Sequence, residues 1–146
     1  MTQKKLGKLV NKEIANFNVL YTKIHNFHWF VNGPHFFELH QKLEELYTEI
    51  GTDMDELAER LLAIGEKPVA TLKEYLELTT LEEATGKENT EDMVQSVITD
   101  FEKLSTEFLE IIEAAEEEDP VTADMLTSMK KSLNKHAWML RAYLGN

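Results

Sequence analysis

The segment from His25 to His40, HNFHWFVNGPHFFELH, contains four of the five histidines of the chain. His28 lies five residues before Gly33, and His40 lies six residues after Pro34. If a helix on each side of this Asn-Gly-Pro turn folds back on the other, both imidazoles lie at about the same height on adjacent antiparallel helices. Two imidazoles facing one space form half of a transition-metal site, which usually also needs carboxylate oxygens.

Two carboxylates later in the chain are candidate oxygen ligands. Asp55 and Glu59 are four residues apart, so on a helix they are neighbours on one face. His40 and Asp55 are separated by roughly 22 Å along a helix that rises 1.5 Å per residue. They therefore cannot bind one ion within a single straight helix. Either the two groups are unrelated, or a second subunit brings them together.

The spacing of these residues favours the second subunit. At about 100° per residue, the direction of the side chains drifts by only about 60° from His40 to Asp55. One polar stripe thus contains His40, Glu44, Gly51, Asp55 and Glu59. Its middle has the small residues Thr48, Gly51 and Thr52, where we expect a two-fold axis with an antiparallel partner helix. Such packing brings the histidines of one chain onto Asp55 and Glu59 of the other, making two equivalent sites.

Composition limits the chemistry of such a site. The chain of 146 residues has no cysteine, which excludes disulfides and thiolate ligands and favours hard or borderline metals such as iron, manganese or magnesium. A formal net charge of -12 attracts cations and repels nucleic acid. No apolar run approaches the ~20 residues that span a bilayer, and the first residues, MTQKKLGKLVNKE, lack a secretory signal. We therefore expect a cytoplasmic protein without membrane contact.

The elements that must position the site are helices. Apolar residues at three- and four-residue spacing predict long helices over residues 3–31, 36–64, 91–118 and from Asp119-Pro120 to about Leu144. The connector between Gly65 and Asn89 contains Thr71-Leu-Lys-Glu74, a capping-box pattern that predicts a short helix to about Leu78. Two helical hairpins joined by a long crossover are typical of an all-α, ferritin-like four-helix bundle, here one domain over residues 1–146.

The spaced motif resembles a known family. His28-Trp29, His40, Glu44, Asp55 and Glu59, with the intervals between them, resemble the ferroxidase motif of the Dps family, the DNA-binding proteins from starved cells or mini-ferritins. The resemblance covers nearly the whole chain. It implies a hollow shell of twelve subunits, a dodecamer, which stores ferric iron and protects the cell against oxidative stress. It places iron sites at two-fold interfaces between subunits.

The resemblance also implies a role for each residue of the motif. His28 binds one ferrous ion from one subunit, while Asp55 and Glu59 bind it from the neighbour, with Glu59 as the bridge. His40 and Glu44 serve a second iron position directly or through water; some members have Asp where this chain has Glu44. Fe(II) and hydrogen peroxide are the expected substrates. Trp29 is either an electron donor beside the iron or a tryptophan packed in an interface.

Other residues of the chain admit two interpretations. His25 and His35 are expected to face solvent or to support the metal ligands, and His136 to be structural. The acidic run of residues 110–119 is usually a solvated helix end. In a closed shell, three copies of such carboxylates around a three-fold axis form an entrance for Fe(II). The candidate pore residues are Glu110, Glu113, Glu117 and, by the family resemblance, above all Asp124.

DNA binding and two rival functions complete the expectations. Family members that bind DNA usually carry a mobile tail rich in Lys and Arg, whereas the helix here begins near Met1 and the lysine cluster is modest. We expect no strong DNA binding at physiological salt. One rival is a non-catalytic shell or DNA-compaction protein in which the stripe only seals the dimer interface. The other is a structural site for zinc or another metal.

Overall fold

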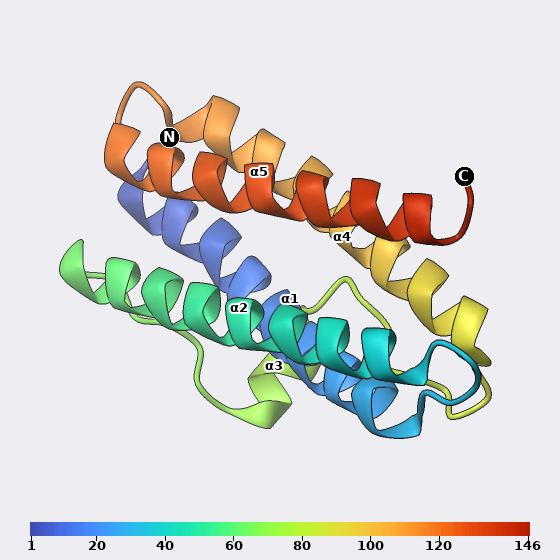
Figure 1. Cartoon of the computed structure of the whole chain (residues 1–146). Helices are drawn as coiled ribbons and strands as arrows, with labels where there is room; N and C mark the ends of the chain where they lie inside the picture. The colour runs from blue at the N-terminus through green and yellow to red at the C-terminus, as the bar shows by residue number, and fades with distance from the viewer.

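Five α-helices make up the fold in the computed structural model, which describes residues 1–146 (Figure 1). Their bounds are α1 Gln3–Phe30, α2 Phe36–Ala63, α3 Leu72–Leu78, α4 Thr90–Ala115 and α5 Pro120–Tyr143. The predicted four-helix bundle with a short helix in the crossover is confirmed. No helix is both long enough and apolar enough to cross a membrane.

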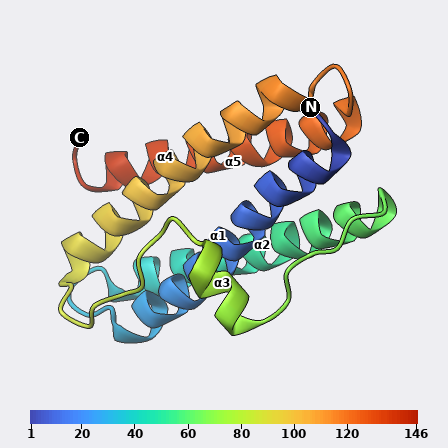
Figure 2. The ribbon, with the colours of Figure 1, turned by 180° about the vertical axis from the view of Figure 1, so that it is seen from behind.

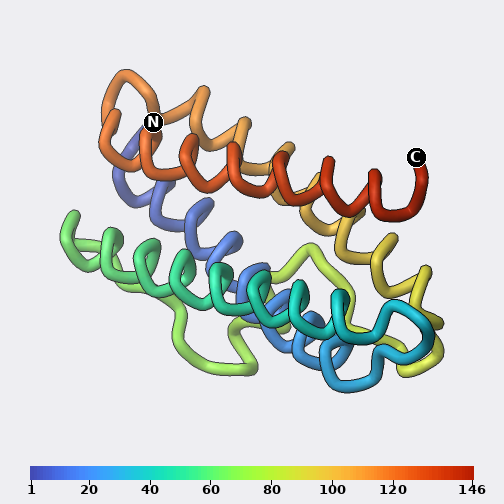
Figure 3. Tube along the Cα trace, in the orientation of Figure 1, coloured from blue at the N-terminus to red at the C-terminus, as the bar shows by residue number.

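The four long helices form two hairpins that pack on each other. α1 lies antiparallel to α2, and α4 lies antiparallel to α5, as the Cα trace in Figure 3 shows. Apolar side chains from all four helices form one buried cluster between the hairpins. Phe17 of α1 meets Phe108 of α4 edge to face, with ring centroids 5.6 Å apart. The hairpin α1–α2 carries the predicted metal ligands, and this core fixes its orientation.

The crossover lies along α1 on the far side of the bundle (Figure 2). Two asparagines of α1 hold it. Asn11 donates to the carbonyl of Lys67 and accepts from the backbone N–H of Val69. Asn16 accepts from the backbone N–H of Thr80 at 2.8 Å. A long segment with little regular structure thus has its backbone groups satisfied by side chains of one helix.

The ends of α1 and α2 follow from local sequence. α1 ends at Phe30, one residue before the predicted end, and Val31 has left the helical conformation, with ψ 143°, ahead of the Asn-Gly-Pro turn. α2 is followed by a glycine in the left-handed region, Gly65 with φ +87°, two residues after Ala63. The backbone N–H of Glu66 bonds to the carbonyl of Leu61, which completes a Schellman motif. The predicted stop at Gly65 is therefore confirmed.

α4 differs from the prediction at both ends. It begins at Thr90, because Asn89 and Asp92 form a reciprocal capping box that the sequence reading did not recognise. It ends at Ala115 instead of Glu118. The acidic residues that follow are unfavourable at the negative end of a helix dipole. Asp119 then caps α5 by accepting from the N–H of Thr122, and Pro120 occupies the first position of α5 as predicted.

Candidate metal centre

His28 of α1 and His40 of α2 lie against each other, as the spacing around the turn predicts. Their rings are stacked with centroids 3.7 Å apart and an interplanar angle of 13°. Each ring also bonds to the backbone of the other residue. The Nδ1 of His28 is 2.7 Å from the carbonyl oxygen of His40, and the Nδ1 of His40 is 2.8 Å from the carbonyl oxygen of His28.

These reciprocal bonds fix the tautomer of both rings. A carbonyl oxygen can only accept, so each Nδ1 carries the hydrogen, and in the neutral ring the lone pair is on Nε2. Histidines that bind metals in proteins typically donate their other ring N–H to a carbonyl or carboxylate in this way. Both imidazoles are therefore oriented for metal binding through Nε2.

Glu44 lies on the same side of α2, one turn after His40. Its Oε1 is 4.0 Å from the Nε2 of His28, whose side chain is 7% exposed, whereas that of Glu44 is 60% exposed. The carboxylate thus lies at the surface, in front of an almost buried imidazole nitrogen. Glu44 thus places a carboxylate next to the free nitrogen of His28 at the outer face of the hairpin.

Asp55 and Glu59 are not part of this group. Both are exposed on α2, which runs without a break between the two ends of the stripe. No three His, Asp or Glu side chains of one chain lie close enough together to hold a metal ion. The predicted ligands therefore lie in two separate groups, one with His28 and His40 and the other with Asp55 and Glu59, which would each be half of the predicted site.

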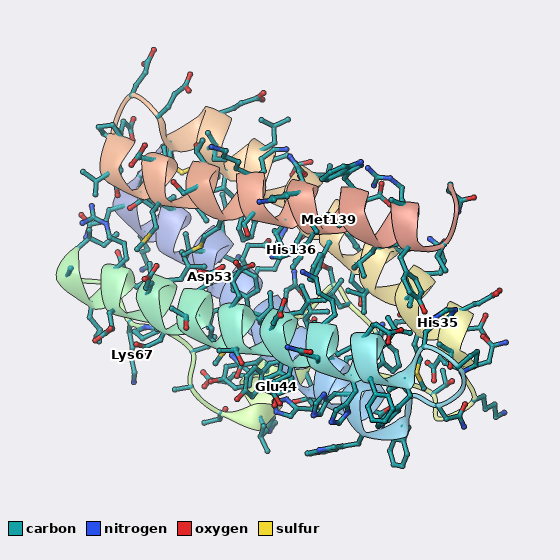
Figure 4. All side chains as sticks on the ribbon, viewed as in Figure 1. His35, Glu44, Asp53, Lys67, His136 and Met139 are labelled. Atoms are coloured by element: carbon teal, nitrogen blue, oxygen red, sulfur yellow. The ribbon has the colours of Figure 1, made fainter.

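The opposite side of α2 has different chemistry. In Figure 4, Asp53 and His136 lie in the space between α2 and α5, while Glu44 lies on the side of α2 away from α5. The Nε2 of His136 is 2.9 Å from Glu49, in agreement with the structural role expected for His136. The hydrogen bond from His136 is the main reason why the pKa of Glu49 is below its usual value. Because Asp53 faces α5, it does not belong to the polar stripe that contains Glu44 and Asp55.

An aromatic cluster beside the histidine pair was not recognised from the sequence. Tyr47 contacts the His28 ring edge to face, with centroids 5.3 Å apart, and stacks on His25 at 3.6 Å. His25 in turn contacts Trp29 at 5.3 Å. Tyr47 follows His40 by seven residues, two helical turns, so its position on the same face was a usable signal. The cluster buries one side of the histidine pair.

Gly51 has a role within the chain that the sequence analysis did not anticipate. We expected it to admit a partner helix, but a Cβ atom there would lie 3.0 Å from the ring of Tyr21 in α1. The missing side chain thus leaves room for Tyr21, which packs edge to face on Tyr47. A two-fold axis near Thr48 and Thr52, both exposed, stays a prediction.

The remaining predicted residues lie at the surface. Trp29 is 66% exposed in the single chain, and Trp138 is exposed as well. His35 is exposed at the turn and contacts Glu38 at 3.4 Å. The four candidate pore residues are all exposed at the end of the bundle where α4 leads into α5, namely Glu110, Glu113, Glu117 and Asp124.

Three comparisons with known proteins bear on this arrangement. The family model described as "Ferritin-like domain" matches residues 7–146. The chain is 51% identical to DNA protection during starvation protein 2 of Bacillus anthracis, over 97% of both chains. It is 50% identical to general stress protein 20U of Bacillus subtilis, over 96% of this chain and 97% of that one.

Solved structures agree with these sequence matches. The crystal structure of a Dps protein from Bacillus brevis superposes with a TM-score of 0.96 at 49% identity, over 99% of both chains. Dps from Listeria monocytogenes superposes with a TM-score of 0.93 at 44% identity, over 97% of this chain and 94% of that one. The similarity thus extends over the complete bundle, including the crossover.

Proposed function

Because this chain belongs to the Dps family of ferritin-like proteins, we propose that it is a ferroxidase that oxidises Fe(II) with hydrogen peroxide and stores the ferric product. Membership of the family supports iron storage and DNA protection as its general role. The proposal adds the reaction, the residues that perform it and the assembly in which they meet.

The stacked pair of His28 and His40 is the single observation that carries the proposal. A histidine that serves only packing has no need of a fixed Nε2 lone pair, whereas a metal ligand does. Here two neighbouring rings have that lone pair fixed by backbone carbonyls, and Glu44 lies in front of one of them. This arrangement supports iron binding more directly than it supports the rival interpretation, in which these residues only pack in the dimer interface.

The half-sites complete each other when two chains pair around a two-fold axis. His28 of one subunit then binds an iron together with Asp55 and Glu59 of its neighbour, while His40 and Glu44 serve the second iron position. Glu59 bridges the two irons. Each ferrous ion gives one electron to peroxide, so two Fe(II), one hydrogen peroxide and two protons yield two Fe(III) and two water molecules. Paired transfer releases no hydroxyl radical.

A shell of twelve subunits is the assembly that fits this proposal. Such a shell contains the ferric oxide, and the exposed carboxylates at the end of α4 and the start of α5 attract Fe(II) to an entrance. The net charge of -12 makes strong DNA binding unfavourable. We therefore propose that any protection of DNA comes from the removal of iron and peroxide.

The decisive experiment adds Fe(II) without oxygen, then hydrogen peroxide, and follows iron and protein together through size-exclusion chromatography. We expect soluble ferric iron to co-elute with a large assembly. The Asp55→Ala variant should still assemble but oxidise iron slowly. Iron that oxidises no faster than in buffer and precipitates away from the intact protein would overturn the ferroxidase proposal and favour a non-catalytic shell. Zinc in the purified, untagged protein that survives dialysis would favour a structural metal site.

A further inference from the structure

A second group of carboxyl side chains lies far from the histidines, where the crossover meets α1 and α4. Glu13 of α1 is completely buried, and Glu107 of α4 contributes a second carboxyl group to the same hydrogen-bond network. The side-chain nitrogen of Asn16 is 3.0 Å from Glu13 Oε1 and 3.2 Å from Glu107 Oε1, so it lies between the two carboxyl groups. The mechanism proposed above uses none of these residues.

Charge does not balance in this group if both carboxyl groups are ionised. Lys12 is the cation beside both, with Nζ 3.4 Å from Glu107 Oε1 and 3.8 Å from Glu13 Oε2. Lys103 donates instead to the carbonyl of Thr80. Glu13 Oε2 is buried and accepts no hydrogen bond. A buried carboxylate with an unsatisfied oxygen and a second carboxylate beside it is strongly unfavourable.

We propose that Glu13 carries a proton in the folded protein at neutral pH and donates it to Glu107, so that the pair shares one negative charge. Two ionised carboxylates can only accept hydrogen bonds, so Glu13 and Glu107 cannot bond to each other. With the proton, Glu13 becomes a donor to Glu107. The pair then has one negative charge opposite the one positive charge of Lys12. This assignment supplies the missing hydrogen bond, and no cation other than Lys12 is needed to balance the group.

The electrostatics of both groups agree with this assignment. Burial is the largest cause that raises the pKa of Glu13, to about 9, and the hydrogen bond to Glu107 raises it further. Burial alone would raise the pKa of Glu107, but hydrogen bonds from Glu13 and Thr80 and the charge of Lys12 lower it overall. The proton therefore belongs on Glu13 and the charge on Glu107.

The shared proton holds the crossover in place. Asn16, which donates to both carboxyl groups, uses its oxygen to accept from the Thr79 hydroxyl at 2.7 Å and from the Thr80 N–H at 2.8 Å. The Thr80 hydroxyl donates to Glu107 Oε2 at 2.7 Å. Loss of the proton places two negative charges around Asn16 and Thr80. The segment that leads from α3 towards α4 then detaches at alkaline pH.

The sign of the pH dependence follows from linkage. A folded-state pKa near 9, above the usual 4.5, gives a contribution to stability that is complete below pH 4.5 and is lost as the pH rises through about 9. Glu13→Gln is the matched control, since a neutral amide of the same shape still donates to Glu107 and does not titrate. The variant should therefore gain stability relative to wild type as the pH rises.

Infrared spectroscopy of the assembled protein in D2O at pH 8 tests the proton directly. We expect a band from a protonated carboxyl group that disappears in Glu13→Gln and persists in Asp53→Asn, since the pKa of Asp53 is raised only to about 7. Absence of the band in wild type overturns the proposal. So does a band that persists in Glu13→Gln and disappears only in Glu107→Gln.

Proteolysis of the crossover tests the conformational consequence. At pH 10, cleavage between residues 79 and 89 should be about tenfold faster in wild type than in Glu13→Gln, while both should resist cleavage equally at pH 7. Equal cleavage rates at pH 10 would contradict the proposal that the shared proton holds the crossover in place. A metal ion bound in stoichiometric amount, and lost in Glu13→Gln but not in His28→Ala, also contradicts it, because a cation would then replace the proton.

Discussion

At the residue scale, the histidine pair is a self-supporting unit. Each ring donates to the backbone carbonyl of the other residue and stacks on the other ring, so neither imidazole needs a carboxylate to hold it. Tyr47 adds an edge-to-face contact to the His28 ring. Partners of this kind commonly affect metal affinity by about 10- to 100-fold when they are removed.

Replacement of His28 tests the unit. His28→Ala removes one ligand and the partner of the His40 ring, so we expect the initial rate of peroxide-dependent Fe(II) oxidation to fall by at least about tenfold. His35→Ala is the control, because that histidine is exposed and contacts Glu38 and Tyr143 only. Stopped-flow absorbance of the ferric product measures both rates. Equal rates in the two variants would contradict the assignment of His28.

Gly51 gives a second prediction at this scale. Gly→Ala in a helix normally stabilises by about 1 kcal/mol, but here the new methyl group lies against the Tyr21 ring. Because overpacking costs about 1–3 kcal/mol, we expect Gly51→Ala to lower the free energy of unfolding by about 1 kcal/mol. Thr52→Ala, at an exposed position, should be neutral or slightly stabilising. Denaturant unfolding compares the two, and a stabilised Gly51→Ala would contradict the proposed packing.

At the scale of the elements, patterns of apolar residues and caps were sufficient to predict all five helices. Gly65, Asp119 and Pro120 end or begin helices as their types predict. The ends of α4 were less accurate, because the Asn89–Asp92 box depends on a reciprocal pair and the acidic residues after Ala115 cannot support a helix end. The spacing of apolar residues shows that a helix is present but does not show at which residue its ends are capped.

The start of α5 depends on Asp119. This carboxylate accepts from the N–H of Thr122 and pairs with Arg60 of α2 at 3.1 Å. Burial alone would raise the pKa of Asp119, but hydrogen bonds from Thr122 and Arg60 outweigh it and lower the pKa. Stability from this group is therefore present above its usual pKa of 3.8 and lost as the pH falls through the folded-state value.

We expect Asp119→Ala to cost about 1–2 kcal/mol at pH 7, the usual effect of losing an N-cap. Asp119→Asn should cost less, because an amide still caps the helix although it no longer pairs with Arg60. Thermal unfolding at pH 7 and at pH 3 measures both variants. The difference from wild type should shrink at pH 3; an unchanged difference would mean that the charge of Asp119 contributes nothing.

At the scale of the whole molecule, the candidate ligands of one chain lie in two separate groups, so the proposed site needs a second chain. Spacing along the sequence located His28, His40, Asp55 and Glu59 and predicted that the two half-sites are apart, and the fold agrees with that separation. The grouping of Glu13 with Glu107 depends on three-dimensional packing and had no such signal, whereas the seven-residue spacing of Tyr47 from His40 was a signal that the prediction did not use. How two chains meet stays a prediction.

Mixed assemblies test how the chains meet. A pair of one His28→Ala chain and one Asp55→Ala chain combines both changes in one site and leaves the other site intact. If equal amounts of the two variants pair at random, about half of the pairs are mixed, and each mixed pair has one intact site out of two. Co-assembly should therefore restore about a quarter of the wild-type oxidation rate. Each variant alone should be nearly inactive, and co-assembled chains that stay inactive would exclude shared sites.

The separation of the half-sites along the unbroken α2 has a consequence for the order of events after synthesis. In a single chain, His40 and the exposed Glu44 lie near the start of this helix, beside the almost buried His28 of α1, whereas Asp55 and Glu59 are exposed near its end. Neither end alone can bring two ferrous ions together. Under the proposed function, oxidation then begins only after chains have paired, so ferric oxide does not precipitate on lone subunits before the shell surrounds it.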